Sequence, residues 1–128
     1  MMIKHSVLVG LIALGGALGA ILRYFISLFI SGYWGNSFPF GTLTVNVIGS
    51  FIMGLFLGWF EIQGVHEQLK AFALIGVLGA LTTFSTFSSD TLLLLQTQQL
   101  GKALLNVGLN TVLCISMVYL GQQFIFRI

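Results

Sequence analysis

The stretch GALTTFSTFSSD, residues 79 to 90, places two phenylalanines and six hydroxyl side chains inside an otherwise apolar segment. Serine, threonine and phenylalanine are poor helix formers, so we expect a local break in the helix that carries this stretch. Inside a membrane, broken backbone is tolerated only where protein or a water-filled cavity supplies partners, and freed carbonyl groups are ready cation ligands. The residues from Gly79 to Thr82 are therefore a candidate cation site.

The chain as a whole has the composition of an integral membrane protein. Of its 128 residues, 57% are hydrophobic and 6% are charged, whereas soluble domains carry roughly 25% charged residues. Apolar runs fall at about residues 6–30, 41–60, 71–95 and 103–126, each near the roughly 20 residues that cross a bilayer as a helix. They predict an all-α fold of four transmembrane helices in a single domain over residues 1–128, with the third helix broken. The short connections predict antiparallel neighbours.

Basic residues are divided almost evenly between the two sides of this layout. Lys4, Lys70 and Arg127 fall on one side, and Lys102 falls on the other, together with Arg23 if it reaches the interface. An excess of Lys and Arg on the cytoplasmic side is what sets orientation, so this weak bias predicts insertion in both orientations. The natural assembly is then an antiparallel homodimer, with its two-fold axis in the membrane plane.

Three polar side chains lie deep inside the apolar runs. Asn46 is about one and a half turns into the second run, where an unpaired amide costs a few kcal/mol, so it needs a partner, a water or a ligand. Asn106 and Asn110 are four residues apart and share one helix face, with Cys114 a further turn along. This stripe can line a water path or hydrogen-bond between helices, and both alternatives remain open. Asn110 and Cys114 are the candidate pore-lining residues of the fourth helix.

Charges and glycines inside the runs carry two further expectations. Arg23 and Asp90 are the charges well inside the apolar segments, and each is either functional or snorkels to an interface. Two GxxxG pairs predict close helix contacts; they are formed by Gly15 with Gly19 and by Gly54 with Gly58.

The sequence argues against several classes of function. His5 and His66 sit at the ends of runs without an acid or nucleophile pattern, so we expect no enzyme. Five scattered basic residues form no patch, so nucleic acid is not an expected partner. The single cysteine excludes a disulfide framework.

Three segments together resemble the signature blocks of the Fluc (CrcB-type) fluoride channels: GGALGAILRY at residues 15–24, GTLTVNVIGSF at residues 41–51 and GALTTFSTFS at residues 79–88. They occur in the family's order, and the four-span layout matches over the whole chain. The resemblance implies a multi-pass protein of the bacterial inner membrane that exports toxic fluoride by passive, electrogenic conduction. It also implies a dual-topology homodimer with two antiparallel pores and a central structural sodium ion.

The resemblance also assigns roles to individual residues. Asn46 matches the pore asparagine, and Phe84 and Phe87 match the paired phenylalanines whose rings meet fluoride; Ser85 and Thr86 resemble the polar track beside them. A ring has a positive edge, which attracts an anion less tightly than a lysine would, and weak serial sites favour conduction. The Asn46 amide and the two hydroxyls are the expected hydrogen-bond donors to fluoride.

The remaining assignments concern cations and the pore vestibule. Gly79 and Thr82 match the sodium positions, where backbone carbonyls of both subunits surround one ion. Arg23 matches a vestibule arginine that concentrates anions. Asp90 departs from the glutamate expected after the third block, which leaves its role open.

Two other readings compete with the channel. A proton-driven small multidrug exporter needs a carboxylate in the membrane, usually in the first helix, and residues 6–30 contain none. A non-transporting assembly subunit, in which every polar residue joins helices, predicts no ion flux from purified protein.

Overall fold

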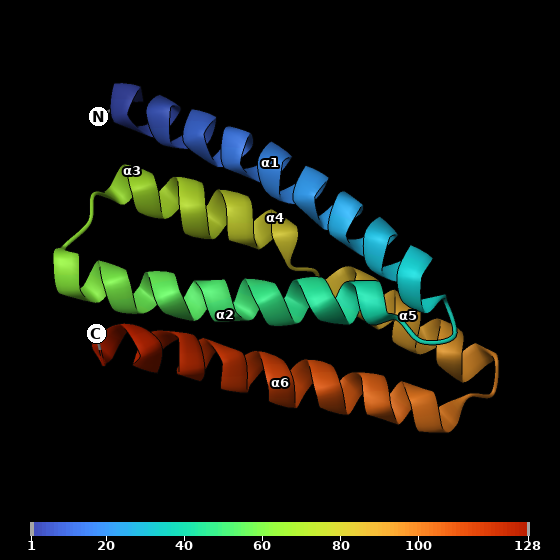
Figure 1. Cartoon of the computed structure of the whole chain (residues 1–128). Helices are drawn as coiled ribbons and strands as arrows, with labels where there is room; N and C mark the ends of the chain where they lie inside the picture. The colour runs from blue at the N-terminus through green and yellow to red at the C-terminus, as the bar shows by residue number, and fades with distance from the viewer. Residues whose placement is uncertain (1, 128) are drawn as a thin grey trace.

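The computed structural model describes residues 2–127, with side chains from residue 5 onward, and this part of the chain is helical without any strand (Figure 1). The elements are α1 (Met2–Trp34), α2 (Phe40–Gln63), α3 (Glu67–Lys70), the π-helix η1 (Ala71–Leu78), α4 (Gly79–Leu81), α5 (Phe84–Gln96) and α6 (Leu100–Phe126). The elements from α3 to α5 follow one another as a single interrupted helix, here called the third span.

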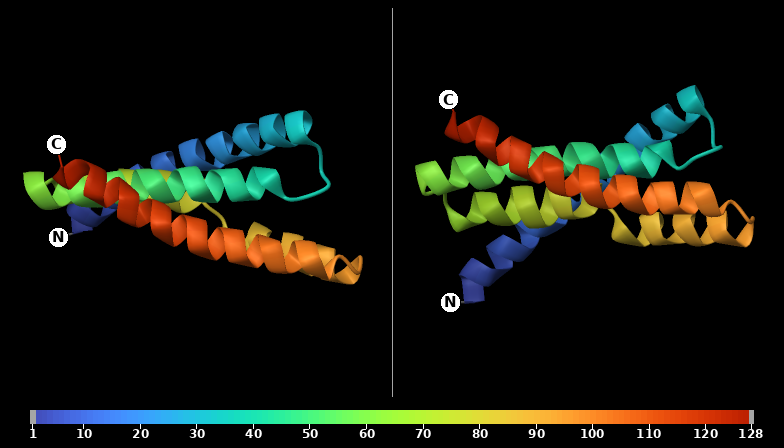
Figure 2. Two further views of the ribbon diagram at one scale, coloured as in Figure 1. Left: turned by 60° about the horizontal axis from the view of Figure 1, so that its bottom comes forward. Right: turned by 90° about the horizontal axis from the view of Figure 1, so that it is seen from below.

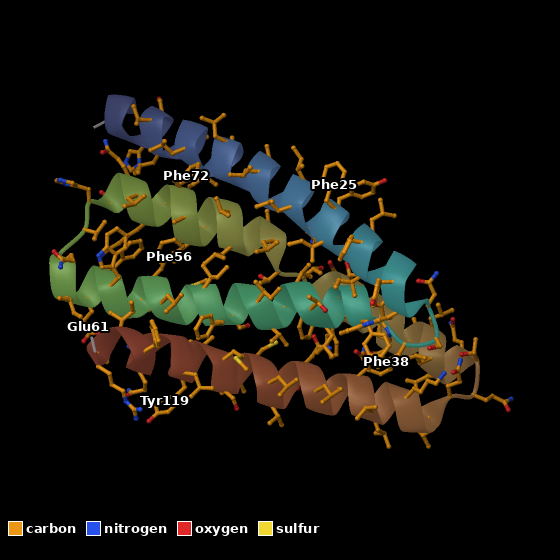
Figure 3. All side chains as sticks on the ribbon, viewed as in Figure 1. Phe25, Phe38, Phe56, Glu61, Phe72 and Tyr119 are labelled. Atoms are coloured by element: carbon orange, nitrogen blue, oxygen red, sulfur yellow. The ribbon has the colours of Figure 1, made fainter. Side chains whose placement is uncertain are left out.

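Four helical segments are long and apolar enough to cross a membrane, as the sequence predicts: His5–Trp34, Phe40–Gln63, Glu67–Gln96 and Leu100–Phe126. They begin or end a few residues outside the predicted apolar runs. Successive spans run in opposite directions, which confirms the antiparallel hairpins (Figures 1 and 2). Large apolar side chains cover the outside of the bundle; Phe25 and Tyr119, both 61% exposed, point away from it (Figure 3).

The predicted break in the third span occurs at Thr82 and Thr83. Thr82 has φ −80° and ψ 155°, and Thr83 has φ −151° and ψ 114°, so both residues are extended. The break is narrower than the hydroxyl-rich stretch, because the Ser88 hydroxyl and the Thr91 hydroxyl donate to carbonyls one turn earlier within α5. Such bonds let serine and threonine sit within a helix.

The glycine pairs give the close helix contacts predicted for them. A Cβ built on Gly15 or Gly19 of α1 would collide with the backbone of η1, and one on Gly54 would collide with the backbone of α6. Gly58 also faces α6, at Ile125 and Gln122. The first half of the third span therefore packs on α1, whereas α2 packs on α6.

The third span changes its neighbour at the break. η1 and α4 lie against α1, whereas α5 lies beside α6 (Figures 1 and 2). The small apolar core of Val45, Leu78 and Leu81 lies where the first half of the third span, η1 and α4, meets α2. Past this core, five of the buried side chains are polar: Thr42, Asn46, Thr83, Asn106 and Asn110.

Candidate functional site

A groove of about 330 Å³ opens beside the break and is lined by residues of α2, the third span and α6. We call it the break groove; none of its lining residues is charged. These residues are Asn46, Gly49, Ser50, Met53, Thr82, Thr83, Phe84, Phe87, Asn110, Thr111, Cys114, Ile115 and Val118. The structure thus brings together six predicted site residues: Asn46, Thr82, Phe84, Phe87, Asn110 and Cys114.

Phe84 and Phe87 form a ring pair at the start of α5. Their centroids are 5.3 Å apart and the ring planes are inclined by 56°. They are three positions apart, so one helical turn presents both rings to the same groove. Phe84 is 80% exposed, so its ring does not pack in the core, and inclined rings offer edges as well as faces to a visiting group.

Asn46 pairs with the broken backbone as a neighbouring strand would. Its Oδ1 accepts from the Thr83 amide at 2.7 Å, and its Nδ2 donates to the Thr83 carbonyl at 3.2 Å and to Asn110 Oδ1 at 2.9 Å. The predicted need for a partner is confirmed. Both amide hydrogens are donated within the chain, so the role of Asn46 as a fluoride donor stays a prediction that this arrangement does not support.

The two carbonyl groups predicted to bind a cation have both lost their helical donors. In a continuous α-helix the amide of Thr83 would donate to the Gly79 carbonyl, and the amide of Thr86 would donate to the Thr82 carbonyl. Instead, Thr83 donates to Asn46, and Thr86 donates to the Thr83 hydroxyl at 3.1 Å. Two hard oxygen ligands at the break therefore lack their helical donors, which suits a small hard cation.

The opposite side of the break carries a second, more polar groove of about 410 Å³. The half-buried Arg23 of α1 lines this groove together with Thr42, Thr83 and Thr86. Thr86 accepts a hydrogen bond from the Thr83 hydroxyl at 3.0 Å. The Ser85 hydroxyl lies 3.3 Å from the same Thr83 hydroxyl. Ser85 and Thr86 are thus next to the break, but they do not line the break groove with the rings.

Asp90 is held by a residue that the sequence did not single out. The Thr42 hydroxyl of α2 donates to Asp90 Oδ2 at 2.6 Å. Thr83 was also missed as a site residue, although a threonine directly before a helix is a favoured N-cap and its side chain does accept from the Thr86 amide. No comparable signal connects Thr42 with Asp90, because the two residues are distant in the sequence.

The fourth-helix stripe divides between the two alternatives. Asn106 is fully buried, and its Oδ1 and carbonyl accept from Asn110 Nδ2, each at 3.0 Å. Asn110 and Cys114 also line the break groove, and the Cys114 thiol is free and half-buried. Hydrogen bonding therefore accounts for Asn106, while Asn110 both forms hydrogen bonds and lines the break groove, and its pore role stays a prediction.

This chain is similar to known proteins over most of its length. Three curated relatives are each called "Fluoride-specific ion channel FluC". The relative from Shewanella sp. (strain W3-18-1) is 58% identical over 116 residues, 91% of this chain and 94% of its own. The relative from Shewanella frigidimarina (strain NCIMB 400) is 57% identical over 116 residues, again 91% of this chain and 94% of its own. The relative from Shewanella woodyi (strain ATCC 51908 / MS32) is 55% identical over 90% of this chain and 93% of its own.

A family model agrees with these relatives. The model described as "CrcB-like protein, Camphor Resistance (CrcB)" matches residues 10–122, which include most of the first and fourth spans, the whole of the other two and the break groove. With bacterial relatives and four membrane-spanning helices, the protein is a multi-pass protein of the inner membrane. By both comparisons, the chain belongs to the CrcB-like protein family.

Proposed function

We propose that this protein is a fluoride-selective channel that lets toxic fluoride leave the cell by passive, electrogenic conduction, without catalysis. The observation that supports this function best is the ring pair of Phe84 and Phe87, which lines an uncharged groove at a helix break. Its relatives' name, fluoride-specific ion channel, points the same way. A groove with ring edges, but without a fixed cation, attracts an anion weakly enough to release it again.

The hydroxyl side chains beside the break supply the donors that replace water around the ion. Thr86 Oγ1 accepts from Thr83, which leaves its own hydrogen free, whereas the exposed Ser85 hydroxyl donates to Thr83 Oγ1 at 3.3 Å and must turn away from it to meet an ion. Because Asn46 gives both hydrogens to Thr83 and Asn110, we assign donation to these hydroxyls and leave Asn46 to shape the groove. Arg23 shares its groove with Thr86, where a positive charge concentrates anions before they meet the rings.

The proposal includes an antiparallel homodimer with two pores and a structural sodium ion on its axis. The balanced basic residues support dual insertion. The Gly79 and Thr82 carbonyls, whose helical donors are diverted, fit a sodium ion. A second copy with the opposite orientation would bring an equal pair of carbonyls, giving the ion more oxygen ligands than one chain offers.

The first prediction is fluoride efflux from liposomes that contain the purified protein. Because the transported ion carries charge, efflux should be slow until a potassium ionophore compensates the voltage, and then fast. A fluoride electrode measures it, with protein-free liposomes as the control. Efflux that ignores the ionophore because each fluoride leaves together with a proton would support a proton-coupled exporter instead. Absence of any flux from monodisperse protein would support the assembly subunit.

The second prediction is that both orientations are present in the cell membrane. A cysteine placed at Gln98, in the exposed turn after the third span, tests it in a Cys114→Ala background. An impermeant thiol reagent should label only part of the protein from outside, and the remainder should react after the membrane is opened. Complete labelling from a single side would contradict dual insertion.

A further inference from the structure

A line of hydrogen bonds, buried at Asn46, Asn106 and Asn110 and partly buried at Thr91, connects α5, α6 and α2. The Thr91 hydroxyl donates to the Phe87 carbonyl at 2.8 Å, and Thr91 accepts from Asn106 Nδ2 at 2.9 Å. Asn110 donates to Asn106, and Asn46 donates to Asn110 and accepts from the Thr83 amide. We call these residues, Thr91, Asn106, Asn110, Asn46 and Thr83, the amide ladder.

Backbone groups at three points fix the direction of every bond in the ladder. The Thr83 amide can only donate, so it requires the oxygen of Asn46 at its side. The Asn106 carbonyl can only accept, so it requires the nitrogen of Asn110. The Phe87 carbonyl takes the Thr91 hydrogen, which leaves the Thr91 oxygen to accept from Asn106. No amide can be turned over without leaving a buried group unpaired, which is costly inside a membrane.

The two ends of the ladder bracket the turn that carries the rings. One end holds the backbone of Thr83, directly before Phe84, and the other end reaches the carbonyl of Phe87 through Thr91. Between these ends the ladder is anchored on α2 and α6, which pack closely through Gly54 and Gly121. The position of the ring pair is therefore set by α2 and α6.

Two members of the ladder lie away from the break groove. Asn106 is fully buried, and neither Asn106 nor Thr91 is among the residues that line the groove. An ion in the groove meets the rings, Asn46 and Asn110, but it does not meet Asn106 or Thr91. Any influence of these two residues on the ion must pass through the groups that they hold, which are the Asn110 amide and the backbone of α5.

We propose that Asn106 and Thr91 are positioning residues for anion selection. The proposal rests on the fluoride conduction proposed above, and adds the residues that hold its ring pair in place. Ring edges discriminate between a small and a large anion only if their separation is held firmly, which requires support from the residues behind them. Loosening the ladder lets the turn from Phe84 to Phe87 shift, so the groove accepts chloride more readily.

The test compares fluoride and chloride efflux from liposomes for Asn106→Leu, Thr91→Val and the double variant. We expect each single variant to lower the ratio of fluoride to chloride flux by about tenfold, the change that about 1.4 kcal/mol of lost discrimination produces. The double variant should lose no more than either single one, since both remove the same connection. Thr91→Ser, which keeps the hydroxyl, should restore the ratio of the unaltered protein.

Thr97→Val is the matched control. Thr97 makes the same kind of bond as Thr91, from its hydroxyl to the Leu93 carbonyl at 2.9 Å, but it is exposed and outside the ladder. We expect Thr97→Val to keep the flux ratio, and size-exclusion elution shows that each variant is folded. If Asn106→Leu does not fold, the Thr91 variants decide alone.

Three outcomes would overturn the positioning role: an unchanged ratio in folded Thr91→Val, additive losses in the double variant, or an equal loss in Thr97→Val. The unaltered protein separates this failure from a failure of the proposed function. If the unaltered protein conducts fluoride and the variants keep its selectivity, only the ladder proposal is wrong. If it conducts no fluoride, the proposed function is itself wrong.

Discussion

Phe84→Leu and Phe87→Ile should each cut fluoride efflux by about tenfold or more, the factor that about 1.4 kcal/mol produces in a rate. Leucine and isoleucine keep an apolar side chain at these positions but lack the positive ring edge that attracts an anion. Phe84 is 80% exposed and Phe87 is half-buried, so neither substitution empties the core. The measurement is efflux from liposomes that hold monodisperse protein.

Two comparisons separate a pore ring from a packing ring. If the rings only packed, the substitutions would cost about 1 kcal/mol of stability and leave conduction unchanged in protein that still assembled. Methionine at either position is the informative third variant, because its polarizable, flexible side chain can replace part of the ring's contact. Normal flux through both the leucine and the isoleucine variants would rule out a ring-lined pore.

Gly121→Val should prevent the protein from folding into its native bundle. A Cβ at Gly121 would meet the Phe51 carbonyl and the backbone nitrogen of Leu55, and backbone atoms on a packed helix cannot move aside as a side chain tip can. Overpacking costs about 1–3 kcal/mol or more, a large part of the about 5–15 kcal/mol that holds a typical fold. The expected result is loss of the monodisperse peak on size exclusion.

Gly108→Val is the control for this variant, because Gly108 lies on the same helix with open space around its Cβ position. It makes the same chemical change in α6 without a collision inside the chain, so it should elute as the unaltered protein does. A monodisperse Gly121→Val protein with normal efflux would contradict the close crossing of α2 and α6.

The architecture could be predicted from the sequence because its causes are local. The apolar runs are long enough to define four spans, and the weak helix formers after Gly79 marked the broken one. The three-residue spacing of Phe84 and Phe87 placed both rings on one face, as the structure has them. Each of these features depends on periodicity or composition within a single helix.

The hydrogen-bond partners could not be predicted, since they depend on how separate helices meet. The sequence shows that Asn46 needs a partner, but it does not show that the partner is the Thr83 backbone. Poor helix propensity covers the whole hydroxyl-rich stretch, whereas the break is confined to two residues by the Thr83 cap. The bond from Thr42 to Asp90 likewise exists only because α2 and α5 lie side by side.

The change of neighbour within the third span has a consequence for how the protein meets bilayers of different hydrophobic thickness. Transmembrane helices accommodate a mismatch of a few Å in hydrophobic thickness by tilting. α1 can tilt together with η1, because its glycines pack closely against the backbone of η1. The extended residues Thr82 and Thr83 carry no helical register across the break, so such a tilt need not rotate α5. The pair formed by α1 and η1 thus adjusts to the thickness of the bilayer, while α5, which bears the rings, keeps its geometry.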